Sequence, residues 1–173
     1  MRFSPGRLAA VFLAALAACT PALDWREAYL EGSGVAMLFP CRPDRHERAV
    51  RLAGVDLRMQ MHSCRAANAT FSLTYVDAAQ PAQVGTLLAE LRDRAVSNIA
   101  GASTVQPFAA PGATPNPHSA RLRIEGRLPD GRAVAEHAAF FARGLRVFQA
   151  TAIGEAMSAE AVETFFGAIK LTP

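Results

Sequence analysis

The sequence predicts a single α+β domain in which helices pack on an antiparallel sheet. Most of the chain after position 25 alternates apolar and polar residues, which is the period of strands with one buried face. Two later stretches instead repeat apolar residues every three or four positions, the period of an amphipathic helix. Short turns containing Gly or Asp join the expected strands, and such turns favour hairpins over crossover connections.

Strands are expected to fill the first half of the domain. They lie at 25–31, 35–39, 46–52, 55–61 and 70–76. The turn Ala53-Gly54 joins the third and fourth of these, because Gly supplies the backbone conformation of a tight turn. This hairpin places each residue i opposite position 107 − i, so Cys64 falls opposite position 43 and close to Cys41.

Two helices are predicted in the remainder of the chain. The apolar stripe of the first consists of Val84, Leu87, Leu88, Leu91, Ala95 and Ile99. Pro81 suits the first turn of this helix, and Gly101 lies just past its end. Ser158 is expected to cap a last helix, whose apolar face holds Val162, Phe165, Phe166 and Ile169. Three strands are expected between the helices, at 120–128, 132–142 and 145–153.

The segment Gln106–Ser119 contains four prolines and Gly112, without apolar periodicity. This composition predicts an extended surface loop, because proline lacks the N–H that sheet pairing needs. We expect it to be the most mobile part of the domain, serving either as a binding loop or as a spacer.

The N-terminus carries an export signal. Arg2 and Arg7 precede a short apolar run that ends in Leu16-Ala17-Ala18-Cys19. This motif resembles the lipobox of bacterial lipoproteins, which implies a signal peptide over 1–18, lipidation of Cys19, a tether over 19–24 and one domain over 25–173. An ordinary signal peptide cut near a cysteine is the alternative. Thr20, in place of Asp, favours the periplasmic face of the outer membrane.

Composition and cysteine count agree with export. The net charge is +3, of which Arg2 and Arg7 supply two charges, so the processed chain lacks the basic excess of a nucleic-acid binder. With Cys19 lipidated, Cys41 and Cys64 remain, and an exported pair at the open end of one hairpin predicts a disulfide.

A second resemblance concerns the whole domain. Trp25, the run Gly34–Pro40, the following hairpin, and the ending Phe165-Phe166 with Ile169-Lys170-Leu171 resemble the PsbP-like fold of a photosystem extrinsic subunit and its bacterial relatives. The resemblance implies an α-β-α sandwich and a superfamily of mostly accessory or binding proteins without catalysis. It rests on pattern and order, so it assigns no functional residue.

Residue patterns typical of catalysis or metal binding are missing from the sequence. The histidines His46, His62, His118 and His137 do not show metal-site spacing, and we expect no cofactor. Met59 and Met61 point to the opposite side of their strand from His62, so the three cannot share one ion. Arginines gather around the first hairpin at 42, 45, 48, 51, 58 and 65, either as a patch for anionic head groups or as a solvated mixed-charge surface.

These observations lead to one hypothesis and one alternative. We expect a lipid-anchored envelope protein without enzymatic activity, whose domain binds another envelope protein or component. The alternative is a periplasmic carrier that holds a small apolar ligand between sheet and helix, with the proline segment as a lid. An unfilled apolar cavity would favour the carrier, whereas a packed core would favour the binding module.

Overall fold

The computed structural model describes residues 22–172, so the predicted signal peptide and Cys19 lie outside the described residues. The described chain contains the strands β1 (Arg26–Leu30), β2 (Val35–Phe39), β3 (Asp44–Leu52), β4 (Val55–Ala66), β5 (Ala69–Asp77), β6 (Ala102–Pro107), β7 (Ala120–Arg127), β8 (Ala133–Arg143), β9 (Arg146–Gly154) and β10 (Lys170–Leu171). The helices are α1 (Pro81–Asn98) and α2 (Ala159–Gly167).

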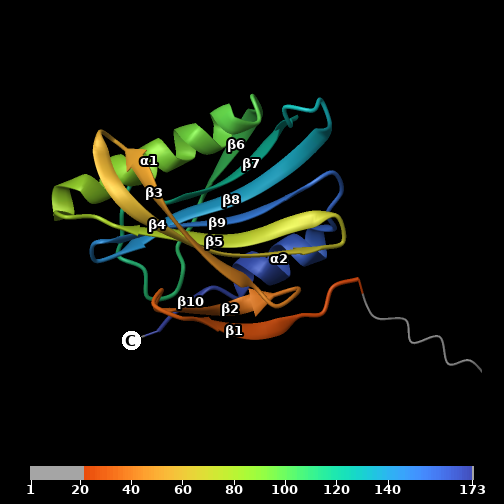
Figure 1. Cartoon of the computed structure of the whole chain (residues 1–173), viewed down its shortest axis with the longest axis horizontal. Helices are drawn as coiled ribbons and strands as arrows, with labels where there is room; N and C mark the ends of the chain where they lie inside the picture. The colour runs from red at the N-terminus through yellow and green to blue at the C-terminus, as the bar shows by residue number, and fades with distance from the viewer. Residues whose placement is uncertain (1–21, 173) are drawn as a thin grey trace, which may run out of the picture.

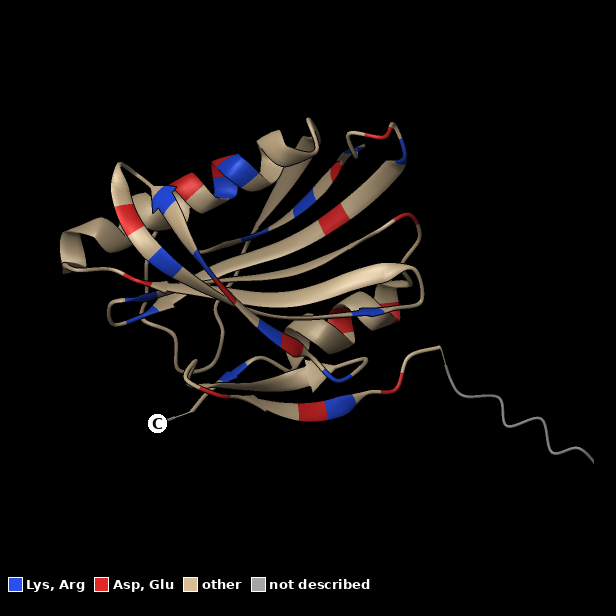
Figure 2. Ribbon diagram, in the orientation of Figure 1, with Lys and Arg blue, Asp and Glu red and all other residues tan. Residues whose placement is uncertain are grey.

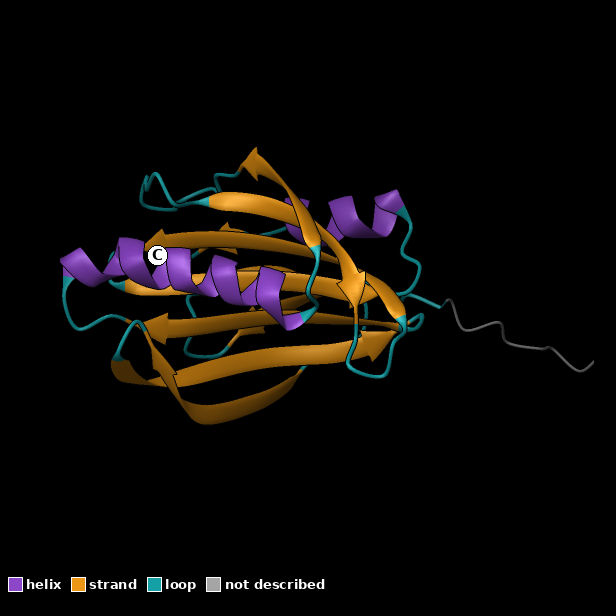
Figure 3. Ribbon diagram, turned by 90° about the horizontal axis from the view of Figure 1, so that it is seen from above, coloured by secondary structure: helices purple, strands orange, loops and turns teal. Residues whose placement is uncertain are grey.

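The strands form two antiparallel sheets. The larger has the order β3-β4-β5-β9-β8-β7-β6, and the smaller has the order β1-β2-β10. Helix α1 lies on one face of the large sheet, while α2 and the small sheet lie on the other (Figure 1). Seen from above, α1 crosses in front of the strands and α2 lies behind them (Figure 3). The expected α+β class with a predominantly antiparallel sheet is therefore confirmed.

Both faces of the central strands of the large sheet are buried, which corrects the expectation of one buried face. Leucines of α1 pack with Leu122, Phe140 and Val147 on one side. On the other side Phe71, Phe141 and Phe148 pack against α2 and β2. Consequently the supposedly polar side of β4 holds buried His62, which is 5% exposed. The sequence pattern failed there because a second layer covers that part of the strand.

The first hairpin has the predicted register. Leu52 lies opposite Val55 and Asp44 lies opposite Ser63, so each residue i faces position 107 − i as predicted. Ala53 and Gly54 both have positive φ, which matches a two-residue turn.

Residues next to the helix ends explain where both helices begin and where α1 ends. Pro81 occupies the first turn of α1, and the Gln83 side chain accepts a hydrogen bond there from the Gln80 N–H at 3.2 Å. The Ser158 side chain accepts a hydrogen bond from the Ala161 N–H, so the predicted cap of α2 is confirmed. Gly101 follows α1 at a close approach, where an added Cβ would lie 2.6 Å from Ile124 Cγ2.

The proline segment differs in part from the expected surface loop: most of its residues are exposed, but it also contains strand residues and core contacts. Gln106 and Pro107 belong to β6, which the sequence analysis did not predict. Ala110 is 5% exposed, and the Phe108 ring lies 5.8 Å from that of Phe141. Thr114 N–H donates to the Ala142 carbonyl at 2.7 Å. The segment therefore packs against the core, and the lack of periodicity predicted only its irregular backbone.

Candidate functional site

A polar hollow lies beside β6, the edge strand of the large sheet. We call it the edge pocket; its volume is about 210 Å³, and it is lined by Thr104, Gln106, Arg121, Arg123, His137 and Glu163, together with Leu122. The sheet register explains how these side chains meet. Thr104 pairs with Arg123, Gln106 with Arg121, and Arg123 with His137, so alternate residues of three strands point to the α2 face.

Arg121 is the most firmly held group in the edge pocket. Its guanidinium donates two hydrogen bonds to the Glu163 carboxylate, at 2.7 and 3.0 Å, and lies 4.5 Å from the centre of the Phe166 ring. The hydrogen bonds from Arg121 lower the pKa of Glu163, although burial opposes them. Such a bidentate pair over an aromatic ring fixes the orientation of α2 relative to β7.

His137 is half-buried beside these charges. Burial lowers the pKa of its imidazole, and the nearby Arg121 and Arg123 lower it further. The ring is therefore neutral at pH 7, with one N–H donor and one acceptor nitrogen. Each guanidinium has a carboxylate partner, Arg121 with Glu163 and Arg123 with Glu125, so the charges around the edge pocket balance.

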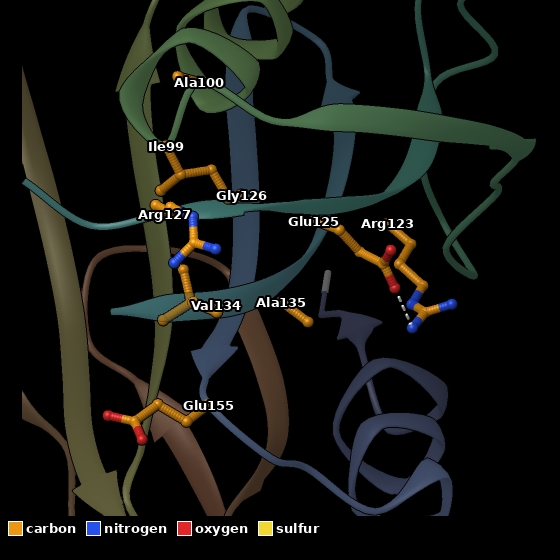
Figure 4. A pocket seen from close by; sticks show the side chains of 10 residues that line it. Ile99, Ala100, Arg123, Glu125, Gly126, Arg127, Val134, Ala135 and Glu155 are labelled. Carbon is orange, nitrogen blue, oxygen red and sulfur yellow. Dashed lines mark ion pairs between the residues drawn. The ribbon is translucent and has the colours of Figure 1, made fainter. Parts of the chain in front are cut away.

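A larger, more open hollow of about 630 Å³ lies next to the edge pocket and shares Arg123 with it. Figure 4 shows Arg123 and Glu125, which lie two residues apart on β7, pointing toward each other at one side of this hollow, with an Nη2–Oε1 distance of 2.5 Å. Ile99 and Val134 form its apolar part. Since both side chains of the Arg123–Glu125 pair are more than half exposed, the pair is weak and Arg123 can exchange partners.

The structure contains the expected disulfide between Cys41 and Cys64. Their Cα atoms are 5.9 Å apart, at the open end of the β3–β4 hairpin. The bond links the hairpin to the segment after β2 and therefore joins the two sheets covalently. The expected lipidation site, Cys19, lies outside the described residues.

The arginines of the first hairpin form a mixed-charge surface. Arg51 pairs with Asp56 and Arg58 with Glu47, while Arg45 lies 3.9 Å from Glu31. Blue and red segments alternate along β3 and β4 in Figure 2. Exposed pairs of this kind are typical of a solvated sheet edge, so the hairpin favours the solvated alternative over an anion-binding patch.

His62 is a buried residue of β4. Its ring stacks on Tyr75 with centroids 6.4 Å apart, and its Nε2 atom is buried without a hydrogen-bond partner. Burial lowers the pKa of His62, and Arg45 lowers it further. Met59 packs in the opposite core, as the strand period predicts. Among residues 22–172, no three His, Cys, Asp or Glu side chains are grouped so as to hold a metal ion.

The sequence analysis missed Glu136, a buried carboxyl on β8. It is 5% exposed, and its strand neighbours are Ile124 on β7 and Ile153 on β9. Burial raises the pKa of Glu136 to about 7. The signal was present in the sequence, because Val134, Glu136, Ala138 and Phe140 alternate along one strand face and only one of them is charged.

Comparisons of the chain with family models, curated proteins and solved structures find no match. Neither described helix is long and apolar enough to cross a membrane.

Proposed function

We propose that this chain is a lipid-anchored envelope protein that binds another envelope protein or component without catalysing a reaction. The motif Leu16-Ala17-Ala18-Cys19 supports the anchor, and Thr20 supports the periplasmic face of the outer membrane. The Cys41–Cys64 disulfide supports an oxidising compartment. The order of layers is consistent with the PsbP-like sandwich, which we include in the proposal.

The edge pocket is the observation that carries the binding role. Its polar groups come from β6, β7, β8 and α2, and the pair of Arg121 with Glu163 holds two of those elements together. A rigid surface with fixed hydrogen-bond donors favours recognition of a partner. In this proposal both residues serve binding: Arg121 holds the Glu163 carboxylate in place, and the neutral imidazole of His137 offers one N–H donor and one acceptor nitrogen.

The apolar-ligand carrier remains a second candidate at a different place. Leu87, Leu88, Leu91 and Phe140 fill the space between α1 and the sheet, where the ligand was expected. However, the proline segment lines a hollow of about 610 Å³, mostly with Pro, Ala and Phe108. The Ser119 hydroxyl, which also lines it, is buried without a partner. An apolar ligand with one polar group would suit this hollow.

The test is crosslinking in native membranes. The full chain, carrying a photo-reactive residue at Thr104, is compared with the same chain carrying Cys19→Ser. The proposal predicts one crosslinked partner of defined mass, which is lost with Cys19→Ser because the domain leaves the membrane. A membrane-bound wild-type chain that forms no specific crosslink contradicts it. Stoichiometric apolar ligand in the natively purified chain, detected by mass spectrometry, identifies the carrier instead.

A further inference from the structure

The described chain enters the domain at one end of the large sheet. Leu23 packs against the core, and the Asp24 N–H donates a hydrogen bond to the Pro40 carbonyl at 2.9 Å. The Trp25 ring is half-buried and lies 6.1 Å from the ring of Phe71. The chain therefore enters at the same end of the sheet as the turn between β4 and β5 and the start of α2 (Figure 1).

We call this end of the domain the tether end; it consists of residues 22–26, 41–44, 65–69 and 154–160. Gly154, the last residue of β9, pairs there with Ala69, the first residue of β5. Arg146 begins β9 at the opposite end of the sheet, directly after Leu145, which is 40% exposed. The nine residues of β9 separate the two ends by about 27 Å.

The proposed anchor at Cys19 is close to the tether end along the chain. The four residue steps from Cys19 to Leu23 span at most about 14 Å, whatever their path. A diacylglycerol on Cys19 places its sulfur at the level of the lipid glycerol, below a headgroup layer that is about 5–8 Å thick. Leu23 can therefore lie at most about 9 Å above the headgroups, which leaves little room between the tether end and the bilayer.

We propose that the tether end rests on the lipid headgroups, held there by the short connection to Cys19, so that the strands of the large sheet lead away from the bilayer. The inference rests on the lipid anchor of the proposed function and adds the surface with which the anchored domain meets the membrane. The opposite end, with the β1–β2 and β8–β9 turns, then lies about 27 Å farther from the membrane.

The side chains of the tether end suit a headgroup layer. Its exposed turns carry small residues such as Ala67, Asn68 and Ala156, and none of its described residues is an exposed large apolar side chain that would enter the hydrocarbon. Asp24 and Glu155 are each ion-paired with an arginine. The remaining charges are two of each sign, on Arg42, Arg65, Asp44 and Glu160. Because these charges balance, the contact does not require anionic lipid.

The test measures the fluorescence of Trp25, the single tryptophan, in the full chain purified from membranes and reconstituted into phosphatidylcholine vesicles. One set of vesicles carries a nitroxide quencher on the lipid headgroup, and a second set carries it in the middle of the acyl chain. We expect the headgroup nitroxide to quench Trp25 several-fold more strongly than the acyl-chain nitroxide, because nitroxides quench only at short range and Trp25 lies beside the headgroups.

Two variants provide the controls. The first combines Trp25→Phe with Leu145→Trp, which moves the fluorophore to the opposite end of the sheet and should lower headgroup quenching several-fold. Phenylalanine at position 25 keeps an aromatic contact with Phe71. The second variant keeps Trp25 and inserts ten Gly and Ser residues after Pro21, a flexible spacer of about 17 Å. It should remain bound to the vesicles, and the quenching of Trp25 should fall several-fold.

Three results overturn the inference. One is equal headgroup quenching of Trp25 and of the tryptophan introduced at Leu145, because neither end would then be nearer the membrane. Another is stronger quenching of Trp25 by the acyl-chain nitroxide, since the tether end would then be inserted. The third is quenching of Trp25 that the spacer leaves unchanged, because the tether would then not hold this end. A chain without lipid that stays free of vesicles contradicts the proposed function, whereas a lipidated chain with equal quenching contradicts the orientation alone.

Discussion

Replacing Glu136 by glutamine should stabilise the domain at alkaline pH. Glu136 is 5% exposed, between Ile124 and Ile153 on the neighbouring strands, and burial raises its pKa. Since the folded chain favours the protonated carboxyl, the contribution of Glu136 to stability is complete below pH 4.5 and is lost as the pH rises to about 7.

The size of the effect follows from these two pKa values. A carboxyl that titrates at 4.5 when unfolded and at about 7 when folded costs about 3 kcal/mol of folding free energy above pH 7. Glutamine has nearly the same shape and carries no charge at any pH. We therefore expect Glu136→Gln to be about 3 kcal/mol more stable than the wild type at pH 8, and nearly equal to it at pH 4.5.

Urea unfolding measures this difference, with the single tryptophan, Trp25, as the fluorescent probe. Its ring lies 6.1 Å from that of Phe71 in the core, so unfolding should change its emission. Glu27→Gln, at an exposed position of β1, is the control and should change the free energy of unfolding by less than about 0.5 kcal/mol at either pH. Equal stability of Glu136→Gln and wild type at pH 8 would refute the assignment of a buried, charge-penalised carboxyl.

Three further predictions concern the core. His62→Phe should make the stability of the domain less sensitive to acid. Burial holds the pKa of His62 below 6.5, so the stability that the wild type has above pH 6.5 is lost as the pH falls. If the free energies of unfolding of variant and wild type change equally between pH 7.5 and 5, this prediction is wrong. Replacing Cys41 and Cys64 together by serine should cost about 3 kcal/mol for a separation of 23 residues; freely alkylated thiols in the native exported chain would contradict the disulfide. Phe108→Ala should cost about 2 kcal/mol, whereas exposed Pro115→Ala should cost almost nothing, and equal melting temperatures would mean that the proline segment is detached.

Local patterns allowed much of the fold to be predicted. The turn at Ala53-Gly54 determines the register of the first hairpin, and that register brings Cys64 near Cys41. The helix α1 follows from its apolar stripe, and Ser158 identifies the start of α2. These features depend on neighbours in sequence, which is why a single sequence is sufficient to predict them.

What the sequence analysis missed depends on contacts between distant segments. His62 is buried because the small sheet and its turn at Glu31 cover β4, and the residues around His62 do not indicate that cover. Phe108 packs on Phe141 through tertiary contact, although its own segment lacks periodicity. The edge pocket likewise draws Arg121, His137 and Glu163 from three elements, so only the sheet register and the position of α2 bring them together.

The intact mass of the chain extracted from native membranes tests the central claim most directly. The account predicts a chain that begins at Cys19 and carries a diacylglycerol and a further acyl chain, since stable anchoring needs more than one chain. Reduction should leave this lipid in place and release only the Cys41–Cys64 bond. A soluble mature chain with a free Cys19 thiol, or an unprocessed N-terminus, would contradict the anchored binding protein proposed for this sequence.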